Sequence, residues 1–149
     1  MSKYSKKLYC ASIDGDSAFY FHNKCDDKLS ILVLIKTPDK RRLGVYTRVN
    51  WKQGSNYEPN TFLFSLDLLK IYPRRDKGYT ILFYTDKGPC FGGDLAIFIG
   101  DKCISTKSCS MKNESKNFDF LGIKSPLCNF EDNDKIELID YEVYQVIFE

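Results

Sequence analysis

Residues 88–101 contain a turn, a glycine pair, an apolar run and a second turn, in the sequence Gly88-Pro89-Cys90-Phe91-Gly92-Gly93-Asp94-Leu95-Ala96-Ile97-Phe98-Ile99-Gly100-Asp101. Proline fixes its own φ and glycine frees its neighbour, so Gly88-Pro89 predicts a chain reversal after the apolar residues 79–84. The pair Gly92-Gly93 permits a positive φ or the close approach of another backbone. Residues 95–99 then predict a strand, which Gly100-Asp101 ends as a hairpin turn. The stretch therefore predicts two apolar strands hinged on a glycine pair.

The composition favours one domain, residues 1–149, built mainly of strands. Hydrophobic residues make up 43% of the chain and include 11 Phe and 10 Tyr, and aromatic residues are enriched in strands. The net charge is only +2, which argues against a nucleic-acid partner because such proteins carry a basic stripe. No apolar run approaches the roughly 20 residues of a membrane helix. The basic N-terminus lacks the hydrophobic segment of a signal peptide, so we expect a cytoplasmic protein without membrane insertion.

The reactive side chains form no recognisable catalytic or metal-binding motif. The six cysteines lack CxxC spacing, and in a reducing compartment we expect free thiols, several of them buried as small hydrophobes. His22 is the only histidine, and Cys10 and Cys25 are the cysteines nearest to it in sequence. A cysteine nucleophile would need His22 as its base. We expect a structural, hydrogen-bonded His22, no metal, no cofactor and no enzymatic activity.

Further segments predict strands on both sides of the opening stretch. They are residues 7–12, 31–35, 43–49, 61–66, 68–72, 102–105 and 135–149. The continuous apolar run 31–35 predicts a strand covered on both faces. A bulge near Ile139-Asp140 would reconcile the two phases of the last strand. Ser17 predicts the N-cap of a short helix that contains His22.

Two segments lack strand periodicity. Residues 50–60 predict a long loop, and residues 106–134 predict an irregular, functional or mobile loop. The order of elements predicts a mostly β (α+β) fold, a two-layer antiparallel β-sandwich with one or a few short helices.

In this order of segments the chain resembles the TLDc domain, over about residues 8–148. The segments that carry the resemblance are 8–17 with Phe21-His22, 32–36 with Gly44, 61–66, 88–97 and 139–146. The resemblance implies a β-sandwich that binds a protein partner, with no settled enzymatic chemistry. Members of the family are linked to oxidation resistance, and several act on the vacuolar proton-pumping ATPase (V-ATPase). Binding to the peripheral part of that ATPase, or a role in oxidative-stress protection, is therefore the expected function.

Two other functions stay open. One is a structural component of a large cytoskeletal assembly, and the other is a cysteine-based peroxide-scavenging enzyme. The candidate partner-binding residues are Phe91, Gly92, Gly93, Asp94 and Glu142. Acidic residues exposed near a glycine bend suit a partner's Lys or Arg, whereas charges that protect strand edges from aggregation are the alternative.

Overall fold

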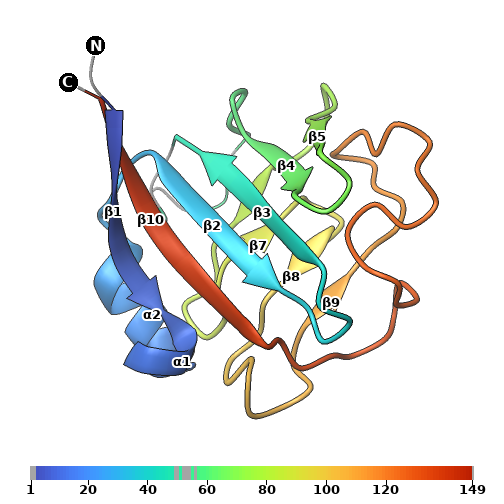
Figure 1. The fold of residues 1–149 in the computed structure, drawn as a ribbon. Helices are drawn as coiled ribbons and strands as arrows, with labels where there is room; N and C mark the ends of the chain where they lie inside the picture. The colour runs from blue at the N-terminus through green and yellow to red at the C-terminus, as the bar shows by residue number, and fades with distance from the viewer. Residues whose placement is uncertain (1–2, 49–50, 52–54, 56, 149) are drawn as a thin grey trace.

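The computed structural model describes residues 3–48, 51, 55 and 57–148. Its elements are β1 (Lys3–Cys10), α1 (Ala11–Asp14), α2 (Ala18–Cys25), β2 (Ile31–Lys36), β3 (Arg42–Thr47), β4 (Phe62–Ser65), β5 (Lys70–Pro73), β6 (Ile81–Leu82), β7 (Cys90–Phe91), β8 (Ile97–Phe98), β9 (Ser110–Met111) and β10 (Asp140–Phe148). A six-stranded sheet, β1-β10-β2-β3-β4-β5, lies in front of a four-stranded sheet, β6-β7-β8-β9 (Figure 1). All strand pairs are antiparallel, which confirms the predicted two-layer β-fold.

The inner face of the six-stranded sheet forms the core. One row of paired residues crosses all six strands: Tyr9, Val143, Val33, Val45, Leu63 and Tyr72. Each of these side chains is 0% exposed. Because directly paired residues point to the same side of a sheet, this row presents one continuous apolar surface to the smaller sheet.

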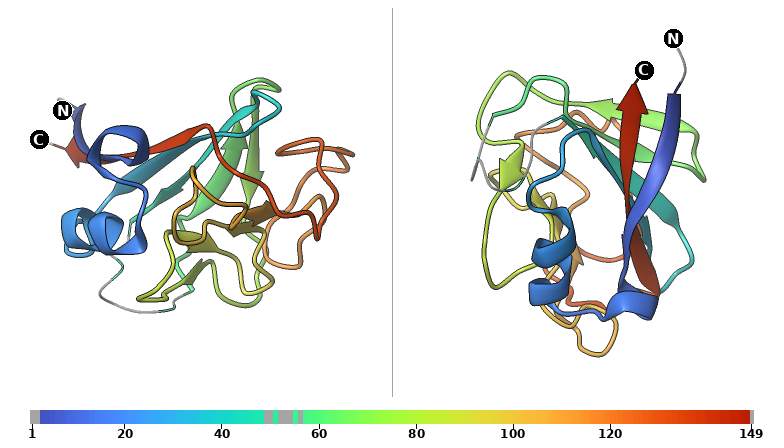
Figure 2. Two further views of the ribbon diagram at one scale, coloured as in Figure 1. Left: turned by 90° about the horizontal axis from the view of Figure 1, so that it is seen from below. Right: turned by 90° about the vertical axis from the view of Figure 1, so that its left-hand side faces the viewer.

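Helix α2 closes one end of this core. It lies on the same side of the six-stranded sheet as the smaller sheet (Figure 2). The Phe21 ring lies 6.0 Å from the Tyr9 ring and 5.5 Å from Trp51, which in turn lies 5.7 Å from Phe91. As predicted, Ser17 caps α2, and its side chain accepts a hydrogen bond from the Tyr20 amide. Neither helix in the described part of the chain is long and apolar enough to span a membrane.

In the described part of the chain, no second layer covers the outer face of the six-stranded sheet. In β2, Ile31, Val33 and Ile35 are buried, whereas Leu32 and Leu34 are only half-buried. The prediction that this strand is covered on both faces is therefore wrong. An apolar run shows that a strand is hydrophobic on both sides, but helix α2 and the second sheet pack against the same side of the larger sheet (Figure 2).

Several local predictions are also corrected. Residues 102–105 form a turn rather than a strand, because the Asp16 carboxylate binds the amides of Ile104 and Ser105 that a ladder would have used. The predicted bulge near Ile139-Asp140 lies instead in β1, between Lys7 and Tyr9. The extra residue changes the alternation of side chains in β1, so that Tyr9 points into the core while Lys7 points to the outer face. Strand β1 runs from Lys3 to Cys10, whereas the predicted strand covered residues 7–12.

The irregular segment 106–134 is packed against the core. It contains β9 and contributes the buried side chains Cys109, Met111, Phe118, Phe120, Leu127 and Cys128. The loop predicted over residues 50–60 falls in part on residues 50, 52–54 and 56, which lie outside the described residues.

Neighbouring residues of β2 provide a test of this arrangement. We expect Val33→Asp to prevent cooperative folding, because it buries a charge without a partner. Leu34→Asp should keep a cooperative melt at a lower Tm, since its side chain reaches the open outer face. Thermal unfolding followed by circular dichroism checks both variants. Equal loss of structure in the two would contradict the assignment of inner and outer faces.

Candidate functional site

The glycine pair forms the turn between β7 and β8. Gly92 has a φ of 86°, and its carbonyl accepts a 2.9 Å hydrogen bond from the amide of Leu95, which has a φ of 60°. Leu95 therefore belongs to the turn, and the strand predicted over 95–99 is shortened to Ile97–Phe98. Gly92 is buried together with Phe91, whereas Gly93 is exposed. Of the predicted contact residues in this turn, only Gly93 is fully accessible to a partner.

Asp94 is bound by its own chain. Its carboxylate accepts a 2.7 Å hydrogen bond from the Lys116 amide and a 3.2 Å bond from the Ser115 hydroxyl. Its amide donates to the Asn117 side-chain oxygen at 3.0 Å. Asp94 thus fixes residues 115–117 against the glycine turn, and its carboxylate already has donors.

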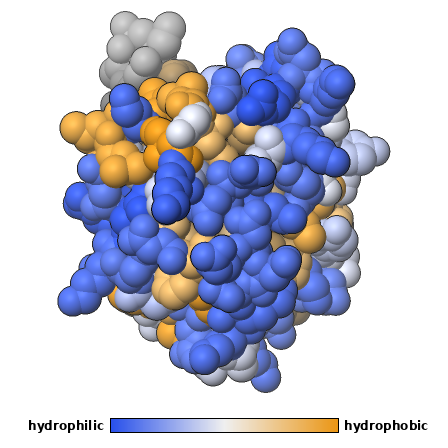
Figure 3. Space-filling view, turned by 90° about the vertical axis from the view of Figure 1, so that its right-hand side faces the viewer, coloured by the Kyte–Doolittle hydropathy of each residue, from blue (hydrophilic) through white to orange (hydrophobic). Residues whose placement is uncertain are grey.

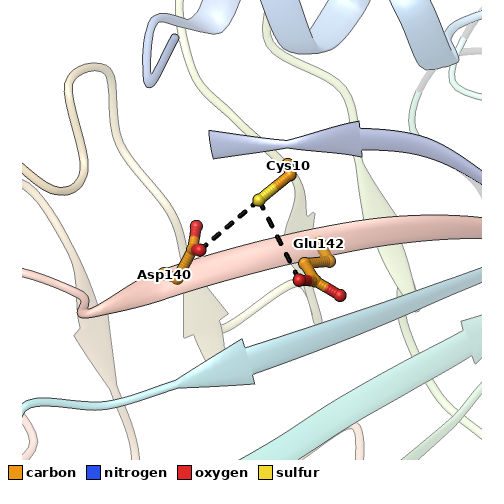
Figure 4. Close-up of side chains that lie close together, drawn as sticks. All are labelled: Cys10, Asp140 and Glu142. Atoms are coloured by element: carbon orange, nitrogen blue, oxygen red, sulfur yellow. Dashed lines mark hydrogen bonds between the residues drawn. The ribbon is translucent and has the colours of Figure 1, made fainter. Parts of the chain in front are cut away.

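Glu142 lies in the other sheet, on the outer face of β10. It pairs across the strands with Cys10, whose Sγ lies 3.9 Å from Oε1 of Glu142 and 3.4 Å from Oδ2 of Asp140 (Figure 4). Lys7 Nζ lies 3.4 Å from Glu142 Oε1, and the Tyr144 hydroxyl donates to Oε2 at 2.5 Å. Glu142 is therefore held in a cross-strand ion pair.

The Cys10, Asp140 and Glu142 cluster has the donor atoms of a small metal site. One sulfur and two carboxylate oxygens lie within 4.8 Å of one another, and such a set suits a borderline-soft cation such as Zn²⁺. Each carboxylate nevertheless has partners within the chain, since Ser12 donates its amide (3.0 Å) and its hydroxyl (2.5 Å) to Asp140. The cluster joins β1, α1 and β10.

Two pKa shifts describe the electrostatics around Glu142. Desolvation alone would lower the pKa of Lys7, but the Glu142 carboxylate raises it above its ordinary value. The hydrogen bond to Glu142 likewise raises the pKa of Tyr144. Both shifts indicate that the neighbouring groups compensate the charge of Glu142.

A groove of about 370 Å³ begins at Glu142. Its lining residues are Leu34, Ile35, Lys36, Arg42, Leu43, Leu66, Ile139, Asp140, Tyr141 and Glu142. The floor is largely apolar, and the rim carries two basic and two acidic side chains. Glu142 also belongs to a row of paired residues on the outer face, which runs from Cys10 on β1 through Glu142, Leu34, Gly44 and Phe64 to Ile71 on β5.

The β4–β5 hairpin continues this surface with exposed apolar side chains. Leu66 is 41% exposed, Leu69 85% and Ile71 61%. Figure 3 views the molecule from the side of β5 and shows a group of apolar residues at the upper left of a mainly hydrophilic surface, with smaller apolar areas elsewhere. We did not predict this surface, because residues 61–66 and 68–72 have the apolar pattern of strands in the core. The run Leu66-Asp67-Leu68-Leu69, unusually apolar for a hairpin turn, was the available signal.

His22 and the cysteines are the groups that a cysteine-based enzyme would use. In His22, Nδ1 lies 2.5 Å from Asp26 Oδ1, and Nε2 lies 2.7 Å from the carbonyl oxygens of Tyr84 and Lys87. This confirms the structural role predicted for His22, which ties α2 to the turn after β6. All six cysteines are free, and all of them are buried, where we expected burial of several.

The two glycines of the turn should respond differently to substitution. We expect Gly92→Ala to destabilise the fold by about 1–2 kcal/mol, because alanine disfavours a positive φ. The added Cβ would also lie 2.9 Å from Oδ1 of Asp94. Gly93→Ala is the matched control, since its Cβ would find its nearest neighbour at 3.5 Å. Urea unfolding measures both variants, and equal destabilisation would refute the difference in backbone strain.

The predicted contact residues therefore occupy two separate places, the β7–β8 turn and the outer face of β10. No curated protein matches this chain. The family model of the TLDc domain matches residues 2–147, nearly the whole chain. The chain belongs to the TLDc domain family.

Proposed function

We propose that this TLDc domain is a non-catalytic protein-binding module whose contact surface is the outer face of the six-stranded sheet. We define the outer-face surface as Leu34, Phe64, Leu66, Leu69, Ile71 and Glu142. The proposed partner is the peripheral part of the V-ATPase. Membership of a family in which several domains act on this ATPase supports that choice.

The observation that carries the proposal is the conformation of Leu69. Its φ is 53° and its side chain is 85% exposed. A left-handed backbone costs a residue with a Cβ roughly 1–2 kcal/mol, and an exposed leucine recovers none of this by burial. Such residues are often found at functional surfaces. Since Leu121 shares both features, Leu69 indicates a contact surface only together with its exposed apolar neighbours Leu66 and Ile71.

The surroundings of Leu69 suit a protein partner. Ile71 and Leu66 extend the apolar surface to either side, and the groove beyond Leu66 ends at Glu142. Apolar anchors at the centre of an interface supply most of its affinity. Charged groups at its rim, here Lys36, Arg42 and Glu142, set orientation and association rate.

The chemistry of the described residues supports a binding role over catalysis. Both nitrogens of His22 face acceptors on the chain itself, so the imidazole is not available as a base to the buried thiols. Asp94 is likewise engaged by residues 115–117, and we propose it as a structural residue of the module.

Replacement of Leu69 should separate binding from stability. We expect Leu69→Asn to raise the stability of the isolated domain by about 1 kcal/mol, because asparagine tolerates the left-handed region. The same change should weaken binding to the purified peripheral sector of the V-ATPase at least tenfold, since a central apolar anchor is lost. Thermal unfolding and a titration of immobilised domain with that sector measure the two effects.

Leu121→Asn is the matched control. Leu121 also has a positive φ, 59°, and is 50% exposed, but it lies outside the hairpin. It should gain stability and keep its affinity. Unchanged binding by Leu69→Asn would remove the hairpin from the interface, and failure of the parent domain to bind the sector would refute the ATPase as partner.

A further inference from the structure

The rim of the groove on the outer face carries four charged side chains, Lys36, Arg42, Asp140 and Glu142. Three of them form one row, because Asp140 pairs with Lys36 across β10 and β2, and Lys36 pairs with Arg42 across β2 and β3. Directly paired residues point to the same side of a sheet. The contacts that each of these charges makes within the chain therefore decide which group of a partner the groove can accept.

The two carboxylates of the rim have their donors within the chain. Asp140 accepts hydrogen bonds from the amide and the hydroxyl of Ser12, at 3.0 and 2.5 Å. Glu142 lies 3.4 Å from the Lys7 ammonium and accepts a 2.5 Å hydrogen bond from the Tyr144 hydroxyl. A partner's basic side chain would have to compete with these contacts.

The two basic side chains of the rim differ from each other. Nε and Nη2 of Arg42 donate to Oδ1 of Asp67 at 3.2 and 3.1 Å. Lys36 is exposed, and no carboxylate of the described residues lies within ion-pair distance of its ammonium. Its cross-strand neighbour Asp140 is bound by Ser12 instead. Lys36 is therefore the rim group that is left to pair with a partner.

Apolar side chains adjoin Lys36 in the same groove. Leu34 is half-buried, and Leu66 and Ile139 are each 41% exposed. Leu34 and Lys36 are two residues apart on β2, so they point to the same face with a spacing of about 7 Å. Alternate residues of any extended segment have this same spacing. A matching segment thus presents an aliphatic side chain and an anion two positions apart.

We propose that the groove binds an extended segment of the protein partner in which an aliphatic residue and an aspartate or glutamate stand two positions apart. The aliphatic side chain packs on Leu34, Leu66 and Ile139, and the carboxylate pairs with the Lys36 ammonium. This inference rests on the proposed function, because it takes the outer face as the contact surface. It reverses the polarity expected for Glu142, since the groove selects an acidic group and not a partner's Lys or Arg.

Two synthetic peptides test the groove without the V-ATPase. Acetyl-Ser-Thr-Leu-Thr-Glu-Thr-Ser-amide has the proposed pattern, and the control peptide has lysine in place of glutamate. NMR amide chemical shifts of the full chain detect binding even when it is weak. We expect the acidic peptide to shift the signals of Leu34, Lys36 and Ile139 and to bind about fivefold more tightly than the control, because attraction to Lys36 becomes repulsion. Equal binding of the two peptides, or shifts confined to residues outside the groove, would overturn the inference.

Replacement of Lys36 identifies the group that makes this selection. Lys36→Gln removes the charge from an exposed side chain, so the fold should remain and the two peptides should bind alike. Lys107→Gln is the matched control, since it removes the charge of an exposed lysine in the connection before β9. It should keep the preference for the acidic peptide. A preference that survives in Lys36→Gln would contradict the role of this ammonium.

A titration with the purified peripheral sector of the V-ATPase separates this inference from the proposed function. We expect Lys36→Gln to weaken binding of the sector about threefold, because one ion pair at a solvent-exposed rim is lost, and Lys107→Gln to leave it unchanged. Sector binding that Lys36→Gln does not weaken would overturn the inference, while the outer face would stand as the contact surface. Peptide selection by a domain that does not bind the sector would support the inference and refute the ATPase as partner.

Discussion

The last strand, β10, lies between β1 and β2 and supplies Val143 to the buried row that crosses the larger sheet. The first and last strands must therefore meet before this sheet is complete. Since the row Tyr9–Val143–Val33 is fully buried, the N-terminal strand is held to the sheet through the C-terminal one. The packing of α2, whose Phe21 contacts Tyr9 and Tyr141, depends on the same pairing.

The bulge in β1 adapts this pairing to two requirements. Before it, Lys7 points to the outer face and reaches Glu142, and after it, Tyr9 points into the core. Bulges commonly redirect side chains in this way at a sheet edge. The outer cluster of Cys10, Asp140 and Glu142 is a consequence, because it forms where the end of β1 meets the start of β10 (Figure 4). The Asp140 carboxylate also holds the first turn of α1, because it accepts hydrogen bonds from the amide and the hydroxyl of Ser12.

Carboxylates hold the irregular parts of the chain. Asp16 binds the turn at residues 104–105, and Asp94 binds residues 115–116. In the case of Asp16, hydrogen bonds from Ser105 and Ile104 outweigh desolvation and lower its pKa. These contacts allow a segment with little regular structure to contribute Phe118 and Leu127 to the core. The smaller sheet, whose strands have only two residues each, depends on them for its shape.

The sequence by itself determined the features that arise from local patterns. Alternation and apolar runs located β2, β3 and β4, the Ser17 cap located α2, and the collinear segments indicated the TLDc family. The absence of CxxC spacing led to the expectation of free thiols, several of them buried. These predictions used the pattern of apolar residues, single capping residues and the order of segments, all of which are visible in the sequence.

Only the tertiary structure decided what covers each face and which distant residues meet. The half-buried Leu34, the exposed hairpin at Leu69 and the separation of Asp94 from Glu142 all follow from sheet order and register. A strand's pattern is the same whether a second layer packs on one face or on both, so the position of the open surface is a property of the assembled sheets.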